Sequence, residues 1–370
     1  MFRRHQRTLA YLTVPMALGL GLTACAGSAS PGSQSSSGGG SNDKIAVTLI
    51  TKDNINPFFI TMQEGAKAAG AQNGVDITLA AGAKDGDEDG QIKAIEAAVA
   101  RGDRGILITP SGPGVNTAIQ NARKQGLYVI ALDTPPDPAD TVDITFATDN
   151  FKAGELIGKW AAAQFNGKEA KIAMLDQFND KVVSVDVNRD QGFLTGMGID
   201  TKDKSKNGDE DKTGTYSAGG KSGSYSIACQ EPTGGAQDGG KSAMENCLAN
   251  TRDINLVYTL NEPAAGGASQ ALEAAGVKGA TIVSVDGACD PGLELVKAGT
   301  IGATSQQYPL KMAQLGVEAI AKIARGGEKP ALTPGQSFFD TGVSLVTDKK
   351  VDGLDSISVA EGDKLCWGKK

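Results

Sequence analysis

Short apolar runs alternate with longer amphipathic runs along residues 44–325, and this alternation restricts the possible folds more than any other feature. The first repeat is an apolar strand at 45–50 and a helix at 58–73, which ends at Gly74. Strands that are apolar on both faces belong to parallel sheets covered by helices on both sides. Because about ten such units are too many for one compact sheet, we expect an α/β fold of two doubly wound, parallel-sheet lobes.

The other elements follow the same pattern. Further strands are expected at 75–80, 105–108, 128–132, 142–147, 171–175, 225–229, 256–260, 281–285 and 301–304. Further helices are expected at 88–100, 114–125, 150–164, 183–197, 241–249, 264–275, 292–298 and 309–325. Residues 200–224 interrupt the alternation and are rich in Asp, Lys, Gly and Ser, which predicts an exposed insert.

The N-terminal segment indicates export. Residues 1–24 combine three arginines with an uncharged apolar stretch and end in Leu-Thr-Ala directly before Cys25, which is typical of a lipoprotein signal peptide. Cys25 is the expected lipidation site, and the Ser/Gly-rich residues 25–43 are the expected flexible tether. The alternatives are an ordinary signal peptide followed by a chance cysteine, or an uncleaved anchor, for which the apolar run is short.

Composition excludes several classes of function. His5 is the only histidine and lies in the signal segment, so the exported chain has no Ser-His-Asp or Cys-His catalytic set and no histidine-ligated zinc. We expect no catalytic residue, no cofactor and no metal site. The net charge is −7, and no basic run is long enough to indicate a nucleic-acid partner.

Four cysteines remain besides Cys25. An even number outside the cytoplasm predicts two disulfides, although spacing does not determine their connectivity. We favour the pairs Cys229–Cys247 and Cys289–Cys366.

Two local motifs resemble ion or nucleotide sites. Residues 85–96 match the EF-hand calcium pattern, but a strand precedes them, and acids that cap the helix at 88–100 are the simpler interpretation. Residues 235–242 match a P-loop pattern, for which a glycine-rich start to the next helix is the simpler interpretation.

Polar and aromatic side chains follow the predicted strands. In parallel sheets, ligands bind beyond the carboxyl ends of the strands, so these side chains form the candidate site. Two adjacent phenylalanines cannot both face the core of one helix, so at least one should point to this site. Aromatic faces, carboxylates, amides and a guanidinium together suit a sugar. The expected substrate-binding residues are Asn56, Phe58, Phe59, Asp133, Arg189, Asn261, Asp286 and Gln307.

These residues lie in motifs that resemble a known family. The motifs include Asn56-Pro-Phe-Phe59, Ile130-Ala-Leu-Asp133, Arg189-x-x-Gly192-Phe193, Asn261-Glu262, Val285-Asp286-Gly287 and Gln307-Tyr308-Pro309. Residues 44–368 resemble the substrate-binding proteins of bacterial ABC sugar importers in the ribose-binding group. The chain looks most similar to fructose-binding lipoproteins, notably in Thr259-Leu-Asn-Glu-Pro263 and the Cys366-Trp367-Gly368 ending. Ribose binders have Asp-Arg where this chain has Asp133-Thr134, which argues against ribose.

The resemblance implies a type I periplasmic binding protein, a monomer with two lobes joined by three crossings. One lobe would comprise residues 44–147 and 308–339, and the other 148–307 and 340–370. The hinge would include Asp149, Gln307 and Asp340. Closure around a monosaccharide would present the protein to the ABC permease in the membrane.

Two other functions remain open at this point. In an extracellular glycosidase, Asp133 and Asp286 would act as the two catalytic carboxylates. A sensor would present the bound sugar or signal to a membrane receptor.

Overall fold

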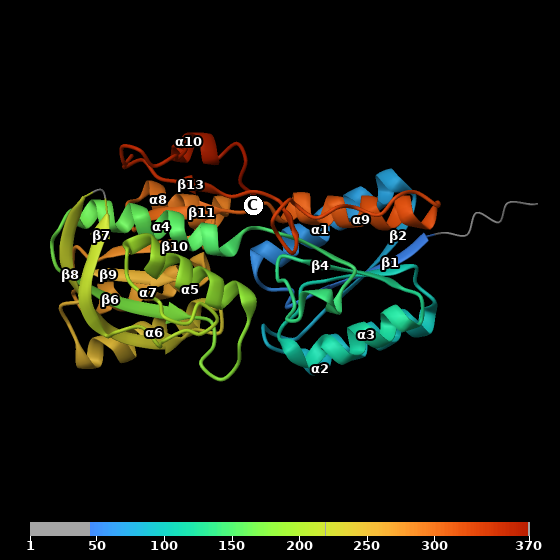
Figure 1. The fold of residues 1–370 in the computed structure, drawn as a ribbon, viewed down its shortest axis with the longest axis horizontal. Coiled ribbons are helices and arrows are strands. Elements are labelled where there is room, and N and C mark those ends of the chain that lie inside the picture. The colour runs from blue at the N-terminus through green and yellow to red at the C-terminus, as the bar shows by residue number, and fades with distance from the viewer. Residues whose placement is uncertain (1–44, 219, 369–370) are drawn as a thin grey trace, which may run out of the picture. The chain divides into compact units, whose positions relative to one another are not determined.

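The computed structural model describes residues 45–218 and 220–368, so the signal segment, Cys25 and the tether lie outside the described residues. Two sheets organise this part of the chain (Figure 1). The first sheet has the strand order β12 (Phe339–Asp340), β5 (Ile144–Ala147), β4 (Tyr128–Leu132), β3 (Gly105–Ile108), β1 (Ile45–Thr51) and β2 (Val75–Ala81). All of its neighbouring strands pair in parallel.

The second sheet is parallel in its centre and antiparallel at its two edges. Its order is β13 (Ser344–Val346), β11 (Ile301–Gln306), β10 (Thr281–Asp286), β9 (Leu256–Thr259), β6 (Ala170–Asp176), β8 (Lys221–Pro232) and β7 (Thr213–Ala218). The predicted α/β class with two parallel-dominated sheets is confirmed.

Helices cover both faces of the first sheet because successive strand residues point to opposite sides. Leu49 packs with α1 (Pro57–Asn73) and α9 (Pro309–Ala324), while its neighbour Ile50 packs with α2 (Glu88–Arg101) and α3 (Asn116–Lys124). We call this sheet and these helices the first lobe. Asn56 caps α1 and Gly74 ends it in the left-handed conformation, at φ 63°, as the sequence pattern predicts.

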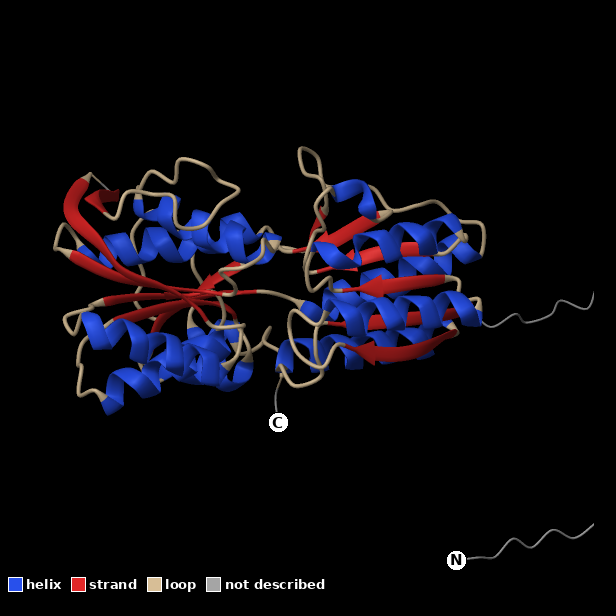
Figure 2. Ribbon diagram, turned by 90° about the horizontal axis from the view of Figure 1, so that it is seen from below, coloured by secondary structure: helices blue, strands red, loops and turns tan. Residues whose placement is uncertain are grey.

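The second sheet is covered in the same way, and Figure 2 shows helices on both sides of its strands. Met174 packs on the side of α4 (Asn150–Phe165) and α5 (Ser184–Met197), and Leu175 on the side of α6 (Gln237–Asn250) and α7 (Glu262–Ala274). We call this sheet and its helices the second lobe. The shorter elements are η1 (Pro113–Val115), η2 (Ala139–Thr141), η3 (Cys289–Leu293), α8 (Glu294–Lys297) and α10 (Val359–Gly362).

The chain passes between the lobes after β5, after β11 and between β12 and β13. The predicted hinge residues lie at these crossings. Asp149 caps α4 by accepting a hydrogen bond from the Lys152 amide, and Asp340 accepts one from the amide of Gly342. Gln307 directly follows β11.

Most of the described residues between 200 and 224 are exposed, as predicted, but the second half of this segment is an ordered hairpin. Residues 213–218 form the edge strand β7, which pairs with β8 in a hairpin. Tyr216 is buried there, and its hydroxyl donates to the carbonyl of Lys168 at 2.7 Å. One aromatic anchor and a ladder of backbone hydrogen bonds are enough to order a polar segment at a sheet edge.

No helix among the described residues is long and apolar enough to cross a membrane.

Candidate functional site

A small cavity lies between the two lobes at the carboxyl ends of the central strands. Its volume is about 30 Å³, enough for one or two water molecules, so anything larger enters only if lobes or side chains move. The residues that line it are Lys52, Asn56, Phe58, Phe59, Asp85, Asp133, Gln177, Val185, Arg189, Leu260, Asn261 and Asp286.

The two adjacent phenylalanines begin α1, and both are almost fully buried. Their rings meet edge to face, with centroids 5.4 Å apart, and both belong to the apolar core of the first lobe as well as to the cavity wall. Both rings therefore pack in the core, contrary to the expectation from the sequence, and both also line the cavity. At the first turn of a helix, side chains can reach a core that wraps around the helix end.

Asn56 and Asn261 occupy equivalent places in the two lobes, each capping a helix. Asn56 Oδ1 accepts from the amide of Phe58 at 3.0 Å, and Asn261 Oδ1 accepts from the amide of Ala264 at 3.1 Å. Capping satisfies exposed amides at the helix start and fixes the asparagine side chain. Both therefore combine a structural role with a place in the cavity wall.

Asp133 and Asp286 follow β4 and end β10, and both have positive φ, at 65° and 133°. Non-glycine residues adopt this region at an energetic cost, which is typical of functional sites. Asp286 lies in a closed network. Its Oδ1 accepts from Gln307 Nε2 at 2.9 Å and lies 3.6 Å from Nη1 of Arg189. Burial raises the pKa of Asp286 to about 7, although Arg189 opposes this shift.

Arg189 comes from α5 and is buried. Its Nε donates to Asn150 Oδ1 at 2.8 Å, and Nη1 donates to the Leu260 carbonyl at 2.9 Å. These two bonds orient the guanidinium toward the cavity edge of the second lobe, where it offers further donors.

Gln307, predicted as a substrate-binding residue, does not line the cavity. It lies behind Asp286, and its backbone amide also donates to the Asp286 carbonyl at 2.9 Å. Its position just after a strand matches the rule for ligand residues, but β11 continues to Gln306 and directs the next side chain to Asp286 instead.

Five wall residues were not predicted from the sequence: the polar Lys52, Asp85 and Gln177 and the apolar Val185 and Leu260. Lys52 is 2% exposed, and its Nζ lies 3.7 Å from Asp85 Oδ2. Gln177 of the second lobe donates to the same Asp85 oxygen, so this contact joins the lobes. Burial raises the pKa of Asp85. Lys52 and Gln177 each directly follow a strand, so the sequence marks both by the same strand-end rule.

The EF-hand pattern does not form a calcium loop, since its first residue, Asp85, lies in the cavity wall. Asp87 instead caps α2, as the simpler interpretation predicts, by accepting from the amide of Gly90 at 3.0 Å. The P-loop pattern is also lost, because residues 237–242 lie inside α6 and form no loop that could cradle a phosphate.

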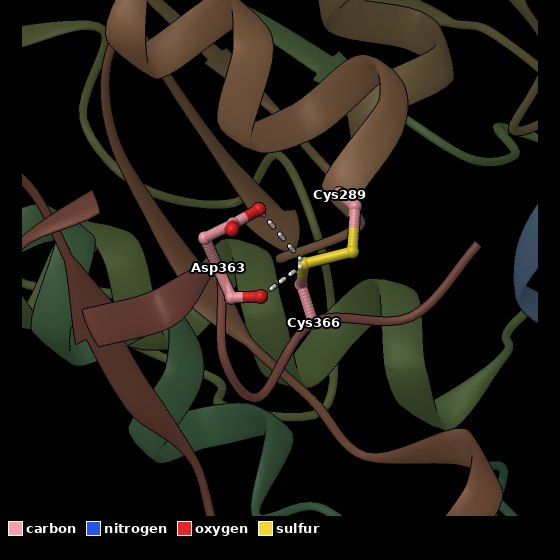
Figure 3. Close-up of side chains that lie close together, drawn as sticks. All are labelled: Cys289, Asp363 and Cys366. Atoms are coloured by element: carbon pink, nitrogen blue, oxygen red, sulfur yellow. Dashed lines mark hydrogen bonds between the residues drawn. A yellow bond between two sulfur atoms is a disulfide. The ribbon is translucent and has the colours of Figure 1, made fainter. Parts of the chain in front are cut away.

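The cysteines form two disulfides, Cys229–Cys247 and Cys289–Cys366. Figure 3 shows Asp363 beside the second, with its oxygens 3.3 and 3.7 Å from Cys366 Sγ. A disulfide sulfur carries no hydrogen and is not a thiolate, so these are close contacts, and the group is not a metal site.

Two doubly wound lobes with polar and aromatic side chains at facing strand ends define the class of two-lobed solute-binding proteins. Residues 45–329 match the family described as periplasmic binding protein domain, and the chain belongs to this family.

Similar proteins cover most of the chain. A ribose import binding protein of Haemophilus influenzae is 27% identical over 300 residues, which are 81% of this chain and 91% of that protein. A D-ribose/D-allose-binding protein of Pseudomonas aeruginosa is 26% identical, covering 82% and 89%. The structure of an ABC transporter solute-binding protein from Agrobacterium vitis with bound D-fucose has a TM-score of 0.70 and 26% identity, covering 87% and 100%.

Behind the cavity, the second lobe buries an unusual group of carboxyls. Burial raises the pKa of Asp176 to about 6 and that of the neighbouring Asp190 well above its ordinary value. Asp190 Oδ1 accepts from Gln191 Nε2 at 2.8 Å, while Asp190 Oδ2 and Asp176 Oδ1 are buried without a donor, a lack that a proton shared by the two carboxyls would remove. At a pH above the ordinary aspartate pKa but below these raised values, the folded state therefore keeps protons on Asp176 and Asp190 that the unfolded chain has lost.

We expect the ligand-free protein to lose stability as the pH rises from about 4 to 7, because groups with raised pKa values lose protons in that window. Asp190→Asn supplies a permanent donor to Asp176 and should flatten this dependence, leaving the variant roughly 1–3 kcal/mol more stable than wild type at pH 8. Urea unfolding at pH 5 and pH 8 measures the effect. If the free energy of unfolding changed equally with pH in both proteins, the two carboxyls would not share a proton.

Proposed function

We propose that this chain is the substrate-binding component of an ABC importer and that it captures a monosaccharide between its two lobes. The observation that carries the proposal is the composition of the cavity wall. Two aromatic rings, three carboxylates, three amides and two cations converge there from both lobes. Sugar rings offer apolar C–H faces to aromatic side chains, and their hydroxyls both donate and accept hydrogen bonds.

Unpaired polar atoms in the wall support a ligand with hydroxyl groups. Oδ1 of Asp85, Oδ1 of Asp133 and Oε1 of Gln177 are buried and have no hydrogen-bond partner within the protein. A buried acceptor without a donor costs about 1–3 kcal/mol, and hydroxyl donors would remove this cost. Each of these oxygens belongs to a residue that lines the cavity.

Within the monosaccharides, we propose a ketohexose such as fructose, or a related polyol or pentose. Support comes from the motifs shared with fructose-binding lipoproteins and from Thr134, which stands where ribose binders have arginine. Relatives are named for ribose, allose and fucose, so the class of ligand has wider support than the particular sugar.

We infer that the sugar is held by closure of the lobes at the three crossings. Hydrogen bonds already join the lobes directly: Ser184 Oγ donates to the Pro135 carbonyl at 2.6 Å and Lys181 Nζ to the Gly86 carbonyl at 3.2 Å. A ligand that contacts both lobes shifts the population toward the closed form by its differential affinity for that form. The closed surface would then be recognised by the permease, with the protein acting as a monomer.

The test begins with mass spectrometry of any ligand released from the purified protein. Calorimetry then measures binding of D-fructose, D-ribose, D-allose, D-fucose, myo-inositol and a set of amino acids. We expect one or more sugars or polyols to bind, and solution scattering to show a smaller radius of gyration in the same sample. Binding of amino acids without any sugar would overturn the proposal. Turnover of aryl glycosides that Asp286→Ala abolishes would indicate a glycosidase instead.

We also propose that Cys25 carries a lipid that anchors the protein outside the cytoplasmic membrane. Cys25→Ala should move the protein from the membrane fraction to the soluble extracytoplasmic fraction, because a Ser/Gly-rich segment without a lipid has no apolar surface that would bind the membrane. Fractionation followed by immunoblotting measures this. An unchanged membrane fraction would exclude the lipid anchor, and Cys25→Ala should bind sugar as wild type does.

A further inference from the structure

The C-terminal segment follows the third crossing and reaches from the second lobe back to the core of the first, without adding a strand to its sheet. After α10 it is fastened by the Cys289–Cys366 disulfide to the loop that follows β10, in the second lobe (Figure 3). The next residue, Trp367, belongs to the apolar core of the first lobe. Figure 1 shows this red segment running from α10 toward the first lobe.

Trp367 is 3% exposed, and three of its contacts involve the cavity wall or residues next to it. Its ring meets Phe58 edge to face, with centroids 5.2 Å apart at 82°. Its Nε1 donates to the Gln307 carbonyl at 2.9 Å, and its carbonyl accepts from the Cys289 amide at 2.8 Å.

Phe58, Gln307 and Cys289 each either line the cavity or lie next to a residue that does. Phe58 lines the cavity directly. Gln307 holds Asp286 through its side chain and its amide. Cys289 lies three residues beyond Asp286 in the same loop, where Glu262 accepts from the amides of Gly287 and Ala288 at 2.8 and 2.9 Å. One indole therefore touches an aromatic wall from the first lobe and the support of a carboxylate from the second.

We propose that Trp367, held in place by the Cys289–Cys366 disulfide, is a positioning residue that sets Phe58 relative to Asp286. This role rests on the proposed sugar-binding function. The disulfide is needed because the last residues of a chain are poorly ordered unless they are fastened. With the disulfide intact, the indole is held between Phe58 of the first lobe and the backbone of Gln307 and Cys289. A dithiol reductant such as dithiothreitol would cleave the S–S bond to two cysteine thiols, becoming oxidised to its own disulfide, and the released tail should lower the affinity for sugar.

Binding measurements test the role. Trp367→Ala, and the pair Cys289→Ser with Cys366→Ser, should each weaken binding of the sugar by about tenfold, because an aromatic contact and a hydrogen bond are lost. Trp367→Phe retains the contact with Phe58 and should recover most of the affinity. The matched control removes the other disulfide, which ties β8 to α6 outside the cavity wall: Cys229→Ser with Cys247→Ser should bind as wild type does below its unfolding temperature. Wild-type affinity in Trp367→Ala would overturn the proposal.

A second readout needs no sugar. The chain has two tryptophans, so in a Trp160→Phe background the emission reports on Trp367 alone. Removing the Cys289–Cys366 bond should shift this emission to longer wavelength as the indole becomes exposed, and removing Cys229–Cys247 should not. An unshifted spectrum in both variants would overturn the fastening role. If wild type binds no sugar, the proposed function fails, while the spectrum still decides whether the disulfide holds the indole.

Discussion

Asp286→Ala should weaken sugar binding by about a hundredfold. The carboxylate is buried at the cavity edge between Arg189 and Gln307, and a ligand hydroxyl paired with it would lose its acceptor. A buried hydroxyl left unpaired costs about 1–3 kcal/mol, which corresponds to roughly ten- to hundredfold in affinity. The upper end is expected above pH 7, where Asp286 is charged and Arg189 would lose its counter-ion. Calorimetry with the best ligand of the panel measures the loss.

Two variants separate binding from folding. Asp286→Asn retains one acceptor oxygen, for Gln307, and should lose less affinity than alanine, since the amide only replaces the other oxygen with a donor of the same size. Asp352→Ala changes an exposed carboxylate outside the cavity wall and should bind as wild type does.

Asn261→Ala should weaken binding too, but also lower the free energy of unfolding by about 1 kcal/mol, because it removes the cap of α7. Wild-type affinity in Asp286→Ala combined with Asn261→Ala would rule out this site.

Gly192→Ala should be among the most destabilising single substitutions in the chain. Helices α4 and α5 pack so closely that a Cβ at Gly192 would lie 2.1 Å from the Phe151 carbonyl oxygen, and one at Gly154 would lie 2.1 Å from the Arg189 carbonyl oxygen. Backbone atoms cannot be avoided by a change of rotamer, so the helices must separate. We expect a loss of roughly 3 kcal/mol or more in the free energy of unfolding, measured by urea titration.

Gly266→Ala is the matched control, because it also lies within a helix, α7, and a Cβ there meets no atom within 4 Å. It should stabilise the protein by about 0.5–1 kcal/mol, since alanine is the better helix former. Gly192→Ala should also weaken sugar binding, because α5 carries Arg189. A Gly192→Ala protein as stable as wild type would show that the helix contact is adaptable.

Most of the helices and strands, and most of the cavity wall, could be predicted from the amino-acid sequence. Apolar periodicity is local, so β1, α1 and their successors are predicted within a few residues of their observed bounds. The rule that ligands bind at the carboxyl ends of parallel strands then selects Asn56, Asp133, Asn261 and Asp286. These positions could be predicted because each depends on a short stretch of chain and on the direction of one strand.

The tertiary structure decided the rest, because it depends on which distant segments meet. The contact of Lys52 and Asp85 with Gln177 joins two lobes, and no periodic pattern specifies such a partner. Gln307 follows the strand-end rule but supports Asp286 from behind, since its direction depends on where β11 ends. Trp367 lies in a tail without periodicity, and only the folded chain brings it against Phe58. Local pattern determined the elements and their strand ends, while packing between remote segments determined which side chains face the cavity and which hold the others in place.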